Sequence, residues 1–143
     1  MFEESGILGQ LRDLAIAYAL AFPIGWDRER GDRSAGLRTF PLVALASCGF
    51  MQAAGPLIQG NPEATARIME GLITGIGFIG GGAIIRSGER VHGTATAAGL
   101  WVTGAIGVAA ALQSYPVAVA LSAGTVVTLR GLRALKYDHD ESG

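Results

Sequence analysis

Residues 91–129 read VHGTATAAGLWVTGAIGVAAALQSYPVAVALSAGTVVTL and contain no Asp, Glu, Lys or Arg. This run is about twice as long as a single helix that crosses a hydrocarbon core of ~30 Å. A second uncharged run covers Thr39–Pro62. A soluble protein of 143 residues has no interior large enough to hide two such runs from water. The sequence therefore predicts an integral membrane protein surrounded by the lipid bilayer.

The apolar residues fall into five segments, each a candidate helix. The last two segments share the uncharged run, and Pro116 suits the first turn of a new helix, so we expect the chain to turn at residues 113–116. We predict an all-α integral membrane bundle of about five transmembrane helices in residues 1–136, followed by a short polar cytoplasmic tail in residues 137–143. The predicted segments are residues 11–26, 40–59, 68–87, 95–112 and 115–129.

The Lys and Arg residues concentrate on one side of this predicted bundle. Basic residues near a bacterial membrane stay on its cytoplasmic side. We therefore predict that the N-terminus lies outside and the C-terminus in the cytoplasm, as an odd number of crossings requires. Arg12 and Arg67 fall on the predicted outer side. The predicted inner side carries Arg28, Arg30, Arg33, Arg38, Arg86, Arg90, Arg130, Arg133 and Lys136.

The composition argues against several other classes of protein. A net charge of −1 supplies no basic field for nucleic acid, so no nucleic-acid partner is expected. The single cysteine, Cys48, excludes an intramolecular disulfide and a thiolate metal cluster within one chain. His92 and His139 are isolated, and no Ser-His-Asp, Cys-His or His-rich set has a plausible spacing. We therefore expect no catalytic residues, no enzymatic activity and no cofactor other than a candidate Mg²⁺ ion.

Glycines concentrate in the third segment, and the chain holds 22 of them, roughly double the average usage of ~7%. Small residues let membrane helices pack closely, whereas bulky aliphatic side chains suit lipid. A bulky stripe of Leu72, Ile76, Ile79 and Ala83 is expected to face lipid, so we predict that this helix is clamped on two sides at the centre of the bundle. Spare glycine faces also favour a homo-oligomer. The predicted packing glycines form two strips along the helix. One strip holds Gly71, Gly75 and Gly82, and the other holds Gly77 and Gly81.

Two carboxylates near the predicted outer side are candidates for a cation site. Glu70 lies on the bearing of a glycine strip, and Asp13 lies on the face of the first segment that we expect to turn towards the bundle. Carboxylates inside a membrane are costly and suggest function, and Mg²⁺ characteristically uses one or two carboxylates and keeps several waters. Asp13 and Glu70 are therefore candidate ligands of a divalent cation. The alternatives are two structural ion pairs, Arg67 with Glu70 and Arg12 with Asp13.

Charges of both signs alternate at the predicted inner side, in residues 27–33 with the sequence DRERGDR. Such a run usually forms a solvated loop beneath a membrane. An alternative is a polar hub in which Glu29 and Arg38 lock the first two helices together. The run begins at the end of a stripe that we expect to face the bundle, formed by Asp13, Ala17, Leu20, Ile24 and Asp27.

The polar and glycine-rich pieces of the chain form a recognisable set. They are GWDRER at residues 25–30, AGLRT at 35–39, RI at 67–68, GIGFIGGGAIIR at 75–86, Gly88 with Val91, GTATAA at 93–98, Trp101, and AIG at 105–107. In order and spacing, over about residues 20–115, they resemble the MgtC/SapB family of bacterial inner-membrane proteins. The polar residues that match the family pattern are Asp27, Glu29, Arg38, Thr39, Arg67, Arg86, Thr94 and Thr96.

This resemblance implies a membrane domain of several helices in the bacterial inner (cytoplasmic) membrane, without enzymatic activity. It also implies a role in adaptation to magnesium limitation or stress and, in pathogens, in survival inside macrophages. The expected mechanism is regulation of other membrane proteins, including the F-type ATP synthase, through the glycine-lined faces. The alternative is a small oligomeric transporter or channel for Mg²⁺ or another cation.

The chain departs from the family pattern at two positions and at its end. Gly71 stands where the family usually has a Gln, and Asn61 stands where an acidic residue usually precedes the Pro of the second loop. We do not expect the soluble C-terminal domain of many family members, because a short charged tail follows Lys136.

Overall fold

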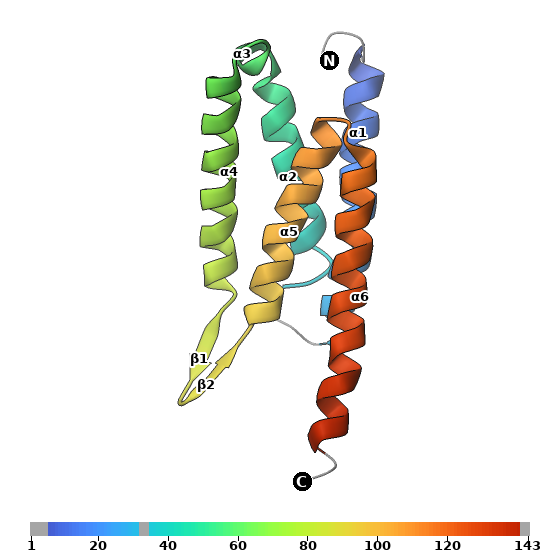
Figure 1. Ribbon diagram of the computed structural model, residues 1–143, viewed down its shortest axis with the longest axis vertical. Coiled ribbons are helices and arrows are strands. Elements are labelled where there is room, and N and C mark those ends of the chain that lie inside the picture. Colours follow the sequence, from blue (N-terminus) through green and yellow to red (C-terminus); the bar gives the residue numbers. More distant parts are fainter. Residues whose placement is uncertain (1–5, 32–34, 141–143) are drawn as a thin grey trace.

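The computed structural model describes residues 6–31 and 35–140, with side chains described as far as Leu135. Arg33 and residues 141–143, which belonged to the predicted inner loop and tail, lie outside this description. The elements are α1 (Gly6–Arg30), α2 (Thr39–Ala53), α3 (Gly55–Ile58), α4 (Pro62–Gly82), β1 (Ile85–Ser87), β2 (Arg90–His92), α5 (Thr94–Ala111) and α6 (Tyr115–Asp140) (Figure 1).

The predicted fold class, an all-α membrane bundle, is confirmed. Within the described part of the chain, three helices are long and apolar enough to cross a membrane: α1, α5 and the Tyr115–Leu135 portion of α6. Helix α2 is apolar but has 15 residues, and α4 carries Glu63, Arg67 and Glu70 in its first half. The five long helices run alternately up and down the bundle (Figure 1). The number of full membrane crossings and their orientation remain predictions.

Helix α5 is the central helix, because it packs against α1, α2, α4 and α6. Its glycines admit these neighbours at close range. A Cβ atom on Gly107 would collide with the Ala44 backbone oxygen of α2, and one on Gly104 would collide with Ile76 Cδ1 of α4. Small residues at such crossings are typical of helix packing in membranes.

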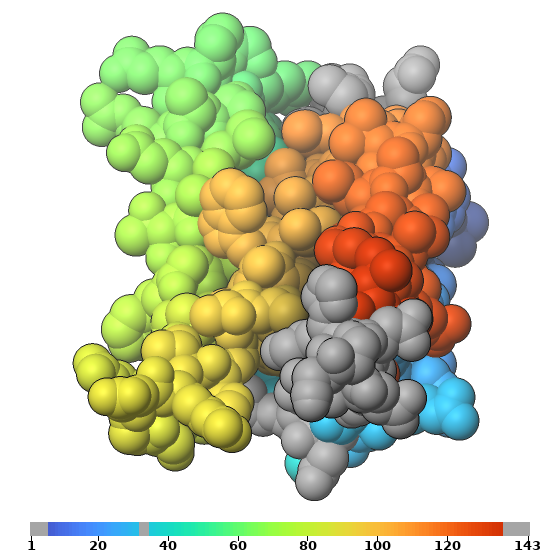
Figure 2. All heavy atoms as spheres, turned by 60° about the horizontal axis from the view of Figure 1, so that its bottom comes forward, coloured from blue at the N-terminus to red at the C-terminus, as the bar shows by residue number. Residues whose placement is uncertain are grey.

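Helix α4 stands at the edge of the bundle, so its predicted central position is wrong (Figure 1). Ile76 and Gly80 are its buried residues, and both turn towards α5. Three residues of the bulky stripe that we expected to face lipid face the chain instead, since Ile76 fills the space above Gly104, Leu72 packs on the core and Ala83 is buried. Ile79, the fourth residue of the stripe, is 47% exposed. Figure 2 shows α4, in green, projecting beside a hollow that α5 and α6 border.

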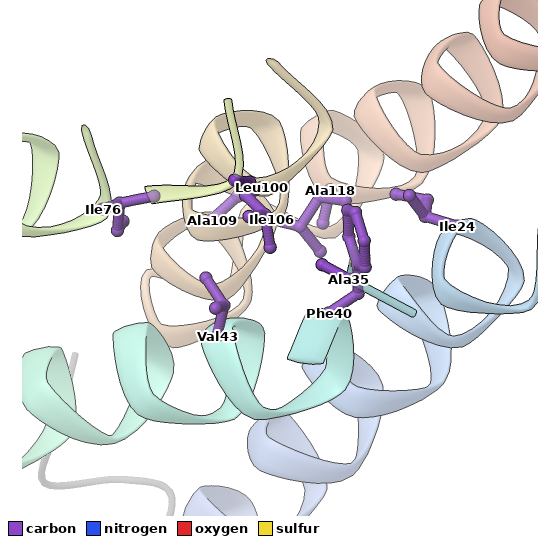
Figure 3. Packing of buried hydrophobic residues seen from close by; sticks show 10 residues of the cluster. Ile24, Ala35, Phe40, Val43, Ile76, Leu100, Ile106, Ala109 and Ala118 are labelled. Carbon is purple, nitrogen blue, oxygen red and sulfur yellow. The ribbon is translucent and has the colours of Figure 1, made fainter. Parts of the chain in front are cut away.

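The buried apolar side chains form two clusters that run through the bundle. In the first, Ile24 of α1, Phe40 of α2 and Leu100 of α5 are almost completely shielded, and Ile76 of α4 and Ala118 of α6 join them (Figure 3). The second cluster lies nearer the N-terminal end of α1 and holds Ala17, Ala21, Ala44, Cys48, Met51, Ile58, Ala110 and Ala111. Cys48 is thus a small buried side chain.

The predicted segment 40–59 is divided in two, because Pro56 cannot continue the hydrogen-bond ladder of α2. Helix α2 ends at Ala53, and α3 makes a single turn before Gly60, whose φ is +70°. Asn61 then caps α4, since its side-chain oxygen accepts a hydrogen bond from the Ala64 backbone N–H at 3.0 Å. Asn and Asp cap helices equally well. The departure from the family pattern at Asn61 therefore preserves a cap that an acidic residue would also provide.

The predicted segment 68–87 ends earlier than expected, because α4 stops at Gly82 and a β-hairpin follows. Three successive glycines end the helix where helix propensity is lowest. In the hairpin Ser87 pairs with Arg90, so Gly88 and Glu89 form a two-residue loop, and Gly88 has the positive φ that such tight turns need. Gly93 also has a positive φ, and a Cβ there would collide with the Ala83 backbone oxygen.

Helix α6 starts at Tyr115, as predicted, but continues to Asp140, well beyond the predicted end at residue 129. The Arg, Leu, Ala and Lys residues that follow are all good helix formers. Ser122 joins α6 to α1 by donating a hydrogen bond to the Leu20 backbone oxygen at 2.6 Å. Helix α6 thus carries its basic residues past the apolar part of the bundle (Figure 1).

Candidate functional site

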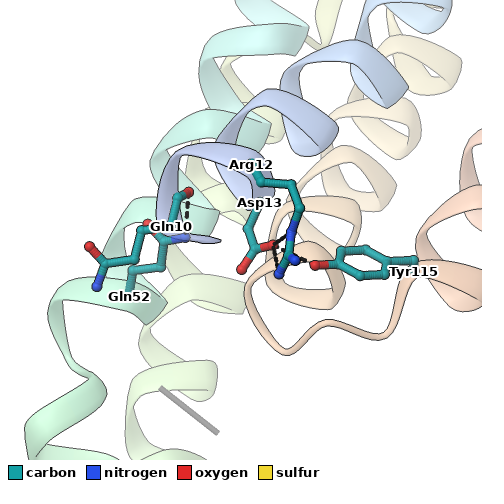
Figure 4. Close-up of polar contacts among 5 residues, drawn as sticks. All are labelled: Gln10, Arg12, Asp13, Gln52 and Tyr115. Atoms are coloured by element: carbon teal, nitrogen blue, oxygen red, sulfur yellow. Dashed lines mark hydrogen bonds and ion pairs between the residues drawn. The ribbon is translucent and has the colours of Figure 1, made fainter. Parts of the chain in front are cut away.

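Asp13 is buried near the N-terminal end of α1, with 3% of its surface exposed. Its Oδ1 atom accepts hydrogen bonds from Nε and Nη2 of Arg12, both at 3.1 Å, and from the Tyr115 hydroxyl at 2.5 Å (Figure 4). The structure therefore contains the Arg12–Asp13 ion pair, one of the two alternatives, and adds Tyr115 from the start of α6. This arrangement balances the charge of Asp13 and joins α1 to α6.

Glu70 does not meet Asp13 within one chain. Its side chain is exposed on α4, and α2 and α5 stand between α4 and α1 (Figure 1). Arg67 forms its ion pair with Glu63 at 3.0 Å, in place of the expected pair with Glu70. Among the described residues no group of three or more His, Cys, Asp or Glu could hold a metal ion. The two candidate carboxylates, Asp13 and Glu70, therefore lie on separate sides of one chain, and their role as cation ligands stays a prediction.

Asp27 lies at the opposite end of α1, fourteen residues or roughly 21 Å from Asp13 along the helix. The stripe between them faces the bundle as predicted, with Ala17 and Ile24 completely buried. Three guanidinium groups converge on the buried Asp27 carboxylate. Arg28 Nη2 lies at 3.0 Å, Arg133 Nη2 at 2.8 Å and Arg130 Nε at 3.4 Å. We call these four residues the Asp27 cluster.

Glu29 and Arg38 do not form the expected side-chain lock. The Glu29 carboxylate accepts a hydrogen bond from the Leu37 backbone N–H at 3.1 Å. A Cβ on Gly36 would collide with the same carboxylate, so a larger residue there would displace it. Arg38 precedes α2 and has an exposed side chain. Glu29 therefore joins α1 to the segment that leads into α2, but through a hydrogen bond to the Leu37 backbone and not through Arg38.

The other polar residues that match the family pattern lie at the starts of helices or in the hairpin. Thr39 and Thr94 are the first residues of α2 and α5, and Thr96 is buried in the first turn of α5. Arg86 donates from Nε to the Gly88 backbone oxygen at 3.0 Å, which supports the hairpin turn. These residues, with Arg28, Arg30, Arg38, Arg90, Arg130 and Arg133, gather at one end of the bundle, which we call the basic end (Figure 1).

The five predicted packing glycines of α4 form an open face. An added Cβ would meet no atom within 4 Å at Gly71, Gly75, Gly77, Gly81 or Gly82. An apolar groove borders α4 on each side. The groove shared with α5 and α6 measures about 330 Å³ and includes Ile73, Trp101 and Val117. The groove shared with α2 includes Leu42, Phe50 and Ile79. Within this chain, then, these glycines do not pack against another helix.

The middle of the bundle contains neutral polar groups. Ser47 and Thr103 donate hydrogen bonds to backbone oxygens four residues earlier, those of Val43 and Gly99, both at 2.8 Å. The buried charged side chains among the described residues are Asp13, Asp27 and Arg28, all close to an end of α1. Sequence reasoning missed Tyr115, Arg130 and Arg133 as partners of these carboxylates. Position was the signal available for them: Tyr115 begins α6, and Arg130 and Arg133 follow the end of its predicted apolar segment.

Comparisons with known proteins agree with this architecture. The family model described as MgtC family matches residues 14–137. Protein SrpB of Synechococcus elongatus is 36% identical, over 90% of this chain and 78% of that protein. Protein MgtC of Salmonella typhimurium is 38% identical, over 84% of this chain and 51% of its own length. Protein MgtC of Brucella abortus is 41% identical, over 66% of this chain and 39% of its own length.

The chain thus spans about half the length of the Salmonella relative. No solved structure matches it. A family model that covers nearly the whole chain, together with relatives of this identity and coverage, is sufficient to assign the family. The apolar helices and these relatives together identify a multi-pass protein of the bacterial inner membrane. The chain belongs to the MgtC family.

Proposed function

We propose that the protein is a non-catalytic membrane regulator that binds the transmembrane helix of another membrane protein against the open face of α4. The observation that carries this proposal is the open face itself. Five glycines on one helix offer backbone surface without side chains, and the grooves on either side supply apolar walls. Helix association in membranes depends on such close packing.

Lipid alone is a poor match for the open face of α4. Leu72 and Ile76 of α4 face the chain itself, and Ile73 and Ile79 are about half exposed beside the two grooves. The open face between the grooves carries the glycines, Glu70 and the protruding Phe78. Acyl chains gain little from a glycine surface, and an exposed carboxylate on a membrane helix is costly unless it is covered or lies among headgroups. A packed helix would cover both.

The alternative function, cation transport, has less support. Transport sites usually place ionisable groups near the middle of the membrane. In this chain the buried charges lie near the ends of α1 and are engaged in ion pairs. The Gly80 and Gly81 backbone oxygens accept hydrogen bonds from Ala83 and Ile84 at the end of α4, so these carbonyls already have donors.

The partner can be a second copy of the chain or a different membrane protein. We expect homo-oligomers because α4 has a free face, and we expect a partner such as the F-type ATP synthase from the resemblance noted above. A role in adaptation to magnesium limitation is part of the same proposal. Because the chain spans about half of Salmonella MgtC, the role of that whole protein is itself a proposal for this chain.

Growth at low Mg²⁺ of cells that lack the gene, with plasmid-borne variants, tests the proposal. We expect Gly75→Leu, on the open face of α4, to abolish rescue while membrane abundance is unchanged. The matched control is Gly124→Leu on α6, where an added Cβ also meets no atom within 4 Å, and it should rescue like the wild type. Rescue by both variants would refute the proposed docking face.

A flux measurement separates the two functions. Purified protein in liposomes with a trapped Mg²⁺ indicator should produce no protein-dependent flux. Flux that Gly75→Leu leaves intact but Asp13→Asn abolishes would establish a transporter and contradict the regulatory proposal. Circular dichroism of the reconstituted protein provides the folding control.

A further inference from the structure

The Asp27 cluster holds more positive than negative charge. One carboxylate meets three guanidinium groups, an excess of two positive charges within these four residues. The neighbouring carboxylate, Glu29, is engaged with the Leu37 backbone N–H. Each guanidinium group has five N–H donors, so two carboxylate oxygens cannot satisfy three of them. The cluster thus has unfilled capacity for an anion.

Arg28 shows most clearly that the cluster has too few hydrogen-bond acceptors for its donors. It is 3% exposed, yet its Nε–H is buried and has no hydrogen-bond acceptor among the described residues. Its Nη2 shares the Asp27 Oδ2 atom with Arg133. A buried donor without an acceptor is unfavourable, and more so when it belongs to a cation. An additional oxyanion beside the cluster would supply acceptors and reduce the excess charge.

The cluster is closed at Arg28 and open on the side of α6. The side chains of Arg130 and Arg133 are 55% and 33% exposed, so a ligand can approach them. Both lie where α6 passes beyond its predicted apolar segment (residues 115–129), which is where we expect the lipid headgroups. Guanidinium groups bind phosphate oxygens through paired hydrogen bonds. Anionic phospholipids place phosphate groups at this depth and are attracted by basic clusters beside membrane helices.

We infer that the Asp27 cluster is a binding site for a phosphate group, with Arg130 and Arg133 as its open side and Arg28 as its buried floor. The phosphate can come from the headgroup of an anionic phospholipid or from free phosphate in solution. Asp27 positions the three arginines and competes with the phosphate for them. This site is at the basic end of α1 and α6, and it does not depend on the open face of α4.

The test uses the purified full chain in nanodiscs of phosphatidylcholine alone or with phosphatidylglycerol, and in phosphatidylcholine with added inorganic phosphate. Phosphatidylcholine is the reference lipid because its phosphate is already neutralised by its own choline cation. Thermal unfolding gives Tm, and native mass spectrometry counts retained lipids. We expect phosphatidylglycerol to raise Tm by several degrees and to remain bound to the protein. Arg133→Gln and Arg130→Gln should each weaken retention about tenfold, because each removes a charge-assisted hydrogen bond. Arg90→Gln, with the same charge change at the same end of the bundle, should retain the lipid.

The outcomes are distinguishable. In one outcome, inorganic phosphate raises Tm, Arg133→Gln abolishes this increase, and no phosphatidylglycerol is retained. This result supports the phosphate site and identifies free phosphate as its source. Equal losses in Arg133→Gln and Arg90→Gln would show attraction to general surface charge and would overturn the site. The absence of any response of the wild type to either phosphate source would also overturn it.

Discussion

Two glycine-rich helices, α4 and α5, use their glycines in opposite ways. In α5, Gly99, Gly104 and Gly107 each lie against an atom of a neighbouring helix, and α5 is the helix that the others surround. In α4, five of the six glycines meet nothing in their own chain, and Gly80 alone among them approaches α5. Glycine spacing therefore marks a helix for close packing, but the partner can lie within the chain or outside it.

The difference has an energetic consequence. A side chain added to a glycine of α5 must displace atoms that already fill the space, whereas one added to the open face of α4 enters unoccupied space. Overpacking a well-filled contact typically costs about 1–3 kcal/mol and occasionally more. The same substitution should thus distinguish the two helices, and the predictions below run from the largest expected loss of stability to the smallest.

Gly107→Leu should be the most damaging change. A Cβ at this position would collide with the Ala44 backbone oxygen and lie 2.8 Å from Ser47 Cβ, and backbone cannot move aside cheaply. We expect a loss of about 3 kcal/mol or more in the free energy of unfolding, measured by denaturation in detergent micelles. Near wild-type stability would mean that α2 and α5 do not cross here.

Ile76→Ala should cost less, about 2 kcal/mol, because it removes a side chain from the space above Gly104 and leaves a cavity that can partly close at the edge of the bundle. This residue is the main point at which α4 joins the bundle. The double variant Ile76→Ala with Gly104→Ala offers a sharper check. The added methyl group should restore part of the loss, whereas a simple sum of two losses would contradict the contact.

Gly80→Ala should be less stable than Gly81→Ala by about 1 kcal/mol, the lower end of the cost of overpacking, because both changes gain the same helix propensity. Its added Cβ would lie 3.3 Å from the Ala97 backbone oxygen, close enough to require a shift of a few tenths of an ångström. The comparison with Gly81→Ala, which enters open space, uses adjacent residues with the same change. Equal stability of these two variants would remove Gly80 from the α4–α5 contact.

Much of the fold could be predicted from the sequence, because it depends on local composition. The uncharged runs predicted the membrane class, and the predicted segment 95–112 differs from α5 by one residue at each end. The bundle-facing stripe of α1 was also correct, since Asp13, Ala17 and Asp27 recur at helical spacing and are buried. Helical periodicity is a local property, so it could be read before the neighbours were known.

The arrangement of the helices could not be predicted in the same way. Periodicity identifies the small and bulky faces of α4 but not which face meets the chain, and the choice of Leu72 and Ile76 as lipid-facing was wrong for that reason. The partners of the buried carboxylates are also distant in sequence: Arg133 lies 106 residues from Asp27, and Tyr115 lies 102 residues from Asp13. The hairpin did have a local sequence signal, because Ser87–Gly88 is typical of a turn and stands before Val91. We nevertheless assigned residues 68–87 to one helix because most of them are apolar.

The most direct test of the account is the free energy of unfolding of Gly75→Leu in dilute detergent micelles, where the chain is monomeric. The open face of α4 predicts a value within about 0.5 kcal/mol of the wild type, since an added side chain meets no atom of the chain. A loss comparable to that of Gly107→Leu would contradict the account. Gly75 would then be packed against its own chain, and no face of α4 would be free for a partner.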